Sequence, residues 1–231
     1  MFATLVNGLA VILGGALGLF FRRGIPERIS SGLMTALGLC VLYIGLRGLT
    51  DGNLTLVLLI ALVLGVLIGS MLDLDSRMNH LGEKMQARFA RKGGDTRFAE
   101  GFVSASLLFC VGAMAVVGSL DAGLRGDGTT ILTKSAIDGV TSIVLASQLG
   151  IGVLFSALPI LLYQGAITLL AMWVAPILTD PVIAEMNCCG SLLIVVIGLN
   201  MIGVTKIKVM NFVPAIFLAG LFAAFWGIYG G

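Results

Sequence analysis

The chain has 231 residues, of which 58% are hydrophobic and 11% are charged, with a formal net charge of +2. Soluble domains are about 45–50% apolar and about 25% charged, so this composition excludes an ordinary soluble domain. The apolar runs are long and unbroken, which favours helices over the alternating strands of an outer-membrane barrel. The chain is therefore predicted to be an all-α polytopic membrane protein, and it has no basic run long enough to bind nucleic acid.

Eight apolar segments predict about eight transmembrane helices, since each is close to the ~20 residues that cross ~30 Å of hydrocarbon. The segments cover about 4–21, 30–48, 54–72, 101–119, 132–150, 155–175, 185–204 and 210–229. The loops that follow odd-numbered segments hold 11 of the 14 lysines and arginines. The positive-inside rule then places both termini on the outer side of the membrane.

Residues 73–100 interrupt this pattern and are expected to form a cytoplasmic amphipathic insert, with a helix over 73–94. Apolar residues recur at helical spacing at Met78, Leu81, Met85 and Phe89. The basic residues between them can face anionic lipid or the cytosol. His80 is the only histidine of the chain and is expected to be a solvated surface residue, because one histidine makes no catalytic or metal-binding constellation.

A weak internal repeat relates the two ends of the chain. Pairing residue n with n+158 aligns Gly32 with Gly190, Ile44-Gly45 with Ile202-Gly203, Asn53 with Asn211 and Gly69 with Gly227, and a shift by one residue aligns Asn7-Gly8 with Gln164-Gly165. Within a single membrane domain, 1–231, this pattern suggests three-span units at 1–72 and 151–231 around the central spans at 101–150. The two units would insert in opposite orientations, an architecture common in secondary transporters.

The polar stretch 118–139 is the strongest functional signal. It holds Asp121, Arg125, Asp127, Lys134 and Asp138 in an otherwise apolar sequence. Ionisable side chains within a membrane are costly and mark substrate or ion paths by default. The first three of these residues sit in a glycine-rich turn, where they are either ordinary solvated charges or part of an entry vestibule or re-entrant tip.

The fifth segment carries a polar stripe that faces away from its apolar side. Its polar positions are Lys134, Ser135, Asp138, Thr141, Ser142 and Gln148, and the opposite side carries Ile137, Val140, Val144 and Ile151. In lipid such a stripe must turn inward. Lys134 and Asp138 stand at i and i+4, close enough to pair. We expect Asp138 to be shielded from lipid and open to an aqueous cavity, although a pair that only pins two helices together is the alternative.

The sixth segment adds Gln164 and Thr168 on one helical face, with Ser156 before them. Asn7 and Asn200 also lie inside apolar segments. Each of these residues is either a ligand for a polar solute or cation, or the source of an interhelical hydrogen bond worth well under ~2 kcal/mol.

Enzymatic templates fit this chain poorly, and we expect no enzyme. An intramembrane aspartyl protease needs Gly-x-Gly-Asp, but Leu124 stands where the first glycine should precede Asp127. No Ser/His pair can form around His80. The four cysteines, Cys40, Cys110, Cys188 and Cys189, lack metal-site spacing and are read as small buried apolar residues. No cofactor or metal is expected; Na⁺ or H⁺ could act as a coupling ion.

The sequence resembles the YdfK/YqgA family of uncharacterised bacterial inner-membrane proteins over nearly its whole length. The resemblance is strongest in FCVGAMAVVGSLDAGLRGD at 109–127, KSAIDG at 134–139 and GIGVLFSALPILLYQGAIT at 150–168. It implies a multi-pass protein of the bacterial inner (plasma) membrane of the kind often described as a transport protein. The polar positions it carries over are Asp121, Asp127, Lys134, Ser135, Asp138 and Gln164.

The leading hypothesis is a secondary transporter of a small polar or charged solute that works by alternating access. Asp138 would bind a coupling cation, a proton or a substrate amine, and Lys134 would neutralise it or hold a carboxylate. Ser135, Ser142 and Gln164 would complete the site. A passive channel and a non-transporting membrane scaffold are the alternatives. The expected partners are membrane lipid, a small-molecule or ion substrate, and a second copy in a homodimer, because close-packing glycines occur on several spans.

Overall fold

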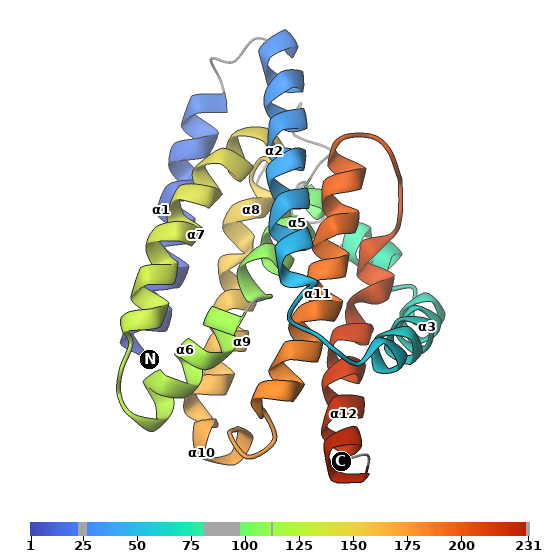
Figure 1. Ribbon diagram of the computed structural model, residues 1–231. Coiled ribbons are helices and arrows are strands. Elements are labelled where there is room, and N and C mark those ends of the chain that lie inside the picture. The colour runs from blue at the N-terminus through green and yellow to red at the C-terminus, as the bar shows by residue number, and fades with distance from the viewer. Residues whose placement is uncertain (23–26, 81–97, 112, 230–231) are drawn as a thin grey trace.

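The computed structural model describes residues 1–22, 27–80, 98–111 and 113–229. These residues form helices joined by short turns, and no strand occurs among them, which confirms the all-α prediction. The helices are α1 (Phe2–Arg22), α2 (Glu27–Gly48), α3 (Thr55–Met71), α5 (Phe98–Cys110), α6 (Ala113–Leu124), α7 (Thr129–Leu149), α8 (Gly152–Phe155), α9 (Ala157–Leu169), α10 (Ala171–Val174), α11 (Asp180–Met201) and α12 (Val213–Tyr229), with a 3₁₀ turn η1 (Val209–Phe212) (Figure 1).

Every segment expected to cross the membrane coincides with a helix or with a broken pair of helices. By length and composition, four helices of the described chain can span a membrane, or up to six if each bent pair counts as one span. Helix α7 is not among them, because its ion pair and its hydroxyl residues lower its hydropathy. The described chain thus has four to six candidate membrane spans, and the eight expected from the sequence stay a prediction.

The span expected at about 101–119 corresponds to two helices rather than to one continuous helix. Helices α5 and α6 meet at a break and differ in direction by 58°. A second bend of 50° separates α3 from the short helix Leu74–His80. The sixth segment is also divided, since α9 ends at Leu169 and α10 follows from Ala171. Of the expected insert at 73–100, the structure describes a helix only over Leu74–His80, while 81–97 lie outside the described residues.

Three helix pairs dominate the packing: α1 with α7, α2 with α11, and α3 with α12 (Figure 1). Glycines allow the closest approach in each pair, as expected for Gly14, Gly18, Gly65 and Gly69. A Cβ atom placed on Gly14 or Gly18 would lie 2.2 Å from a backbone carbonyl oxygen of α7. These glycines pack within one chain, so they give no support to the expected homodimer.

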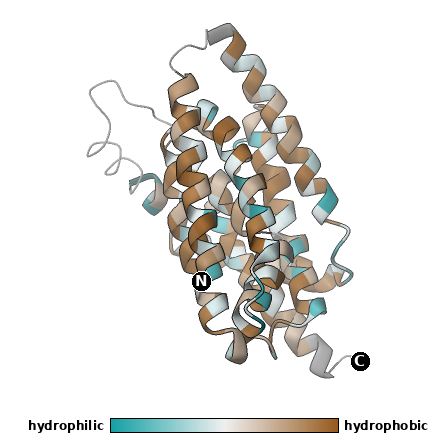
Figure 2. Cartoon of the chain, turned by 90° about the vertical axis from the view of Figure 1, so that its left-hand side faces the viewer, coloured by the Kyte–Doolittle hydropathy of each residue, from teal (hydrophilic) through white to brown (hydrophobic). Residues whose placement is uncertain are grey.

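The outward faces of the helices are apolar (Figure 2). The exposed side chains of α7 include Ile137, Val140 and Val144, three of the four residues expected on its outer side, and also Leu132. Cys40 is also exposed, against the expectation that all four cysteines are buried, whereas Cys188 and Cys189 are buried and Cys110 is half-buried. All four cysteines are free thiols.

The apolar core lies where α5, α7, α9 and α11 meet. Its largest fully buried side chains include Phe109, Leu145, Leu149, Ile160 and Leu193. Burying a side chain of this size stabilises the fold by about 1.5–3 kcal/mol. This core holds the inner face of α7 against α5 and α1, and it therefore fixes the position of the polar stripe.

Candidate functional site

A buried ion pair lies at the centre of the polar stripe on α7. The Lys134 ammonium donates to both Asp138 carboxylate oxygens, at 2.7 and 2.5 Å. The two residues are only 6% and 4% exposed. One helical turn separates them, which is the spacing that allows an i,i+4 pair. The pairing expected from the sequence is confirmed.

Helix α5 closes the pair from another side. The Lys134 ammonium lies 5.9 Å from the centre of the Phe109 ring. A cation over an aromatic face is attracted by the ring quadrupole, and the attraction is larger where water is excluded. The ammonium is thus held by one carboxylate and one aromatic ring, inside a shell that excludes lipid.

Helices α1 and α9 connect to the pair through Asn7. Its Nδ2 donates to Asp138 Oδ2 at 3.2 Å and to Gln164 Oε1 at 3.2 Å. Asn7 and Gln164 are both fully buried. Helix α1, which is distant in the sequence, therefore meets α7 and α9 where a carboxylate and two amides come together. The position of the amides follows from the glycines, because Gly8, Gly14 and Gly18 let α1 lie close to α7 and α9.

Thr4 and Thr168 lie one turn beyond this level. Helices α1 and α9 run antiparallel, so the Asn7–Gln164 contact places Thr4 beside Thr168 on the next turn. Helices α1 and α7 run parallel, since Gly14 approaches Gly139 and Gly18 approaches Ile143, and on this face Asn7 reaches Asp138. We call Thr4, Asn7, Lys134, Asp138, Gln164 and Thr168 the polar cluster.

Four atoms of the polar cluster are buried without a hydrogen-bond partner in the described part of the chain. They are Thr4 Oγ1, Asn7 Oδ1, Gln164 Nε2 and Thr168 Oγ1. More than 90% of buried polar groups in proteins have a partner, and leaving one without costs about 1–3 kcal/mol. These four atoms belong to two adjacent helices, α1 and α9, and Asn7 joins both helices to the buried ion pair.

The Asp138 carboxylate is enclosed by neighbouring side chains, and its side chain is 5% exposed. Two larger cavities are hollowed into the described structure, and Asp138 lines neither of them. Its carboxylate is enclosed by Lys134 and Asn7. The residues of the polar cluster are therefore buried inside the chain, and the expected opening of Asp138 to an aqueous cavity stays a prediction.

The structure places the acids of the glycine-rich turn away from the polar cluster. Asp121 forms a surface ion pair with Arg125 at 3.4 Å. The Asp127 carboxylate accepts from the backbone N–H of Thr129 at 2.9 Å, at the start of α7. Hydrogen bonds from the Thr129 side chain and backbone hold the pKa of Asp127 below its ordinary value. Both acids organise the turn between α6 and α7.

The two serines of the expected site lie on the buried face of α7, but their hydroxyls are used locally. Ser135 donates to the carbonyl of Ile131 at 2.7 Å, and Ser142 donates to that of Gly139 at 2.7 Å. Ser142 also lies against Gly14, where a Cβ would approach its hydroxyl to 2.2 Å. Ser135 adjoins the polar cluster, whereas Ser142 belongs to the packing of α1 on α7.

Comparison with known proteins agrees with the sequence resemblance. A family described as "Protein of unknown function (DUF554)" matches residues 2–224. The chain belongs to this family. It is 33% identical over 222 residues to "Uncharacterized membrane protein YdfK" of Bacillus subtilis (strain 168), which covers 94% of this chain and 93% of the relative. It is 30% identical over 224 residues to "Uncharacterized protein YqgA" of Escherichia coli (strain K12), covering 96% and 95%. No solved structure matches the chain.

Sequence reasoning missed Thr4 and gave Asn7 no place in the site. Both stand on α1 at i and i+3, a spacing that keeps them on one helical face. This spacing is a signal that the sequence does contain. The signal was weak because a threonine and an asparagine in an apolar helix can either bind a solute or form an interhelical hydrogen bond. The sequence does not show that Asn7 contacts Asp138.

Glu185 is a second buried acid that sequence reasoning missed. It is 3% exposed on α11, and its Oε1 accepts from the backbone N–H groups of Asn53 at 2.6 Å and Leu54 at 2.8 Å. These N–H groups precede the first turn of α3, where a negative charge is favoured by the helix dipole. Glu185 thereby joins the start of α3 to α11, a structural role separate from the polar cluster.

Proposed function

We propose that this chain is a secondary transporter of a small polar or charged solute, with the polar cluster as its binding site. The observation that carries the proposal is the group of four unpartnered polar atoms beside a buried ion pair, at the junction of α1, α7 and α9. A purely structural ion pair would require no such atoms, because removing them would stabilise the fold. A site that receives a solute requires them.

An inverted repeat supports this proposal. The repeat aligns Asn7 with Gln164, and Asn7 Nδ2 donates a hydrogen bond to Gln164 Oε1 at 3.2 Å. Residues related by a two-fold axis meet only where that axis passes between them. The polar cluster would then lie at the interface of the two three-span units, where secondary transporters bind their substrates.

Helices α2 and α11 pack antiparallel through reciprocal glycine contacts. Gly45 approaches Val195 and Ser191, while Gly198 approaches Leu42 and Gly38. Gly198 is 153 residues after Gly45, and Val195 and Ser191 are 153 residues after Leu42 and Gly38. The two sets of contacts are therefore related by the same shift in residue number. Any pair of antiparallel helices that pack along one face gives such reciprocal contacts, and the shift of 153 differs by five residues from the 158 of the sequence repeat, so the support for the repeat comes from the Asn7–Gln164 contact.

Eight crossings with both termini outside fit the packing directions. Helix α1 runs parallel to α7 and antiparallel to α9, as first, fifth and sixth crossings must. Residues after the third and seventh segments line one cavity together, with Asp75 and Asn79 opposite Lys206 and Lys208. These two loops therefore share a side. The excess of basic residues there supports a cytoplasmic assignment in a bacterial inner membrane.

The closed ion pair favours alternating access over an open channel. A channel would need a continuous polar pore, but here Lys134 and Asp138 neutralise one another in an enclosed position. In the proposed cycle, an arriving solute or a coupling Na⁺ or H⁺ competes with Lys134 for Asp138. The exchange of partners releases the contact between α7 and the α1–α9 pair, and the site opens to the other side.

The proposal is tested by uptake into proteoliposomes under imposed proton and sodium gradients, with a panel of amino acids, organic acids and polyols. We expect uptake of at least one class by the natural chain and a loss of gradient-driven uptake in Asp138→Asn. Asp121→Asn is the matched control, because Asp121 also pairs at i,i+4 but at the surface. Normal gradient-driven uptake by Asp138→Asn would show that the pair has no coupling role.

A further inference from the structure

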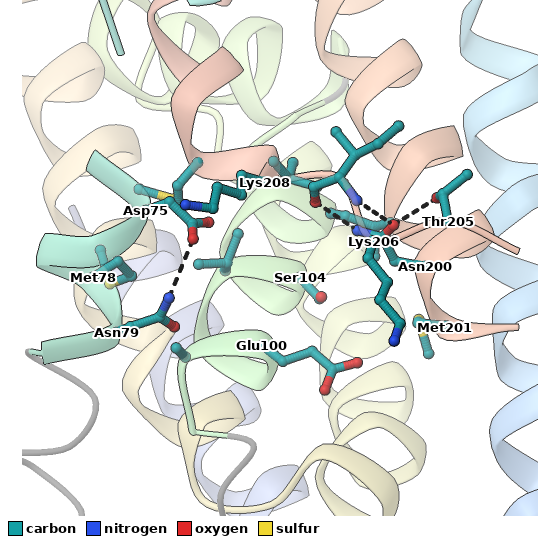
Figure 3. A pocket seen from close by; sticks show the side chains of 16 residues that line it. Asp75, Met78, Asn79, Glu100, Ser104, Asn200, Met201, Thr205, Lys206 and Lys208 are labelled. Atoms are coloured by element: carbon teal, nitrogen blue, oxygen red, sulfur yellow. Dashed lines mark hydrogen bonds between the residues drawn. The ribbon is translucent and has the colours of Figure 1, made fainter. Parts of the chain in front are cut away.

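A second polar cavity lies at the end of the molecule where the third and seventh segments finish (Figure 3). Its volume is about 300 Å³. Its walls come from the helix Leu74–His80, the start of α5, the end of α11 and the turn Thr205–Met210. We call it the vestibule. It is separate from the polar cluster, and none of the six residues of that cluster lines it.

The vestibule carries charges of both signs. In Figure 3 the ammonium of Lys206 and the carboxylate of Glu100 extend into the same space, with the hydroxyl of Ser104 beside them. Asp75 and Lys208 place a second carboxylate and a second ammonium in another part of the wall. A ligand with one positive and one negative group is therefore complementary in charge to the vestibule.

The remaining wall is apolar and leads inward. Met78, Val103 and Met210 line the vestibule, and Val103 and Met210 also line a second cavity of about 260 Å³. That inner chamber is bounded by apolar side chains of α5, α9, η1, α11 and α12, and at its other side by Cys110 and Tyr163. The vestibule thus suits a ligand that has an apolar body behind its charged groups.

The inner chamber adjoins the polar cluster through neighbours in the chain. Cys110 follows Phe109, whose ring holds the Lys134 ammonium, and Tyr163 precedes Gln164. The vestibule is lined by residues near the start of α5, and Phe109 near the end of the same helix contacts the Lys134 ammonium. Both sites combine an ammonium with a carboxylate, so both are complementary to the same kind of molecule.

We propose that the vestibule binds a small zwitterion with an apolar side chain, of the class of the apolar α-amino acids. Lys206 holds the carboxylate of the ligand, Glu100 holds its ammonium, and the side chain lies against Met78 and Met210. As a statement about the transported substrate this inference rests on the proposed function. As a statement about binding it stands alone, because the vestibule is present in the conformation that the structure describes.

The test is binding of radiolabelled L-leucine to the full chain purified in detergent, measured by scintillation proximity. We expect saturable binding that Lys206→Met and Glu100→Gln each weaken about tenfold, since each loses one charge-assisted contact. Both residues are exposed, so the substitutions leave the fold intact. Arg125→Gln is the control, because Arg125 is exposed and lies outside the vestibule.

Two analogues with one charge sharpen the result. Leucinol lacks the carboxylate and 4-methylpentanoate lacks the amine, and we expect neither to compete well with L-leucine. The paired variant Lys134→Met, Asp138→Leu should keep vestibule binding even if uptake is lost, which separates this inference from the transport proposal. Absence of L-leucine binding, competition by either analogue equal to that of L-leucine, or unchanged binding in Lys206→Met would each overturn the inference.

Discussion

Replacing Asp138 by leucine alone is expected to destabilise the protein by about 3–5 kcal/mol, because the Lys134 ammonium would remain buried without its carboxylate. Replacing both partners, as Lys134→Met with Asp138→Leu, should recover most of this loss. A buried ion pair exchanged for apolar side chains of similar volume is often neutral or stabilising. The measurement is thermal unfolding in detergent of the natural chain, the two single variants and the paired variant.

The chain provides a matched control for this double-mutant cycle. Asp121 and Arg125 pair with the same i,i+4 spacing at the surface, where the Arg125 side chain is 78% exposed. Exposed pairs contribute about 0–1 kcal/mol, so Asp121→Leu should change stability little. If Asp138→Leu were as mild as Asp121→Leu, Lys134 would have to reach water, and the enclosed pair described above would be incorrect.

The contact between α1 and α7 should be equally sensitive to a single methyl group. A Cβ on Gly18 would lie 2.2 Å from the Ile143 carbonyl oxygen and 3.0 Å from Ala146 Cβ. Because both neighbours belong to the backbone or core of α7, the helices must separate. Overpacking of this kind costs about 1–3 kcal/mol, occasionally more. We expect Gly18→Ala to lower the thermal midpoint in detergent, and uptake as well, since Asn7 moves with α1.

Gly32→Ala is the control for this prediction. A Cβ on Gly32 meets nothing within 4 Å, and Gly32 lies in helix α2. The same substitution there should be neutral or stabilising by about 0.4–1 kcal/mol, because alanine restricts the unfolded chain without strain. Equal effects at the two positions would contradict the close α1–α7 contact.

The features that could be predicted from the sequence are those set within one element. The i,i+4 spacing of Lys134 and Asp138 determines their pairing on any helix, and Ile137 and Val140 had to face outward once the polar stripe faced inward. The apolar runs determined the positions of the helices to within a few residues. Such local patterns need no knowledge of the neighbouring helices.

The features that could not be predicted depend on which helices meet. Asn7 and Asp138 are 131 residues apart, and only the packing of α1 on α7 makes them partners. Glu185 reaches the start of α3 from another unit of the chain, and the vestibule joins two loops that are far apart in the sequence. The break between α5 and α6 was missed because the apolar composition continues through it. Hydropathy alone detects no change of direction.

The most direct test of the central claim is whether water reaches the polar cluster from both sides of the membrane. Thr168→Cys, in a background with the four native cysteines replaced by alanine, places a thiol at one of the unpartnered positions. Labelling with a membrane-impermeant maleimide is then compared in right-side-out and inverted vesicles. We expect reaction from both faces, with Leu145→Cys in the apolar core unreactive. A thiol at Thr168 that reacts from neither face would contradict the account, because the polar cluster would then be a sealed structural contact.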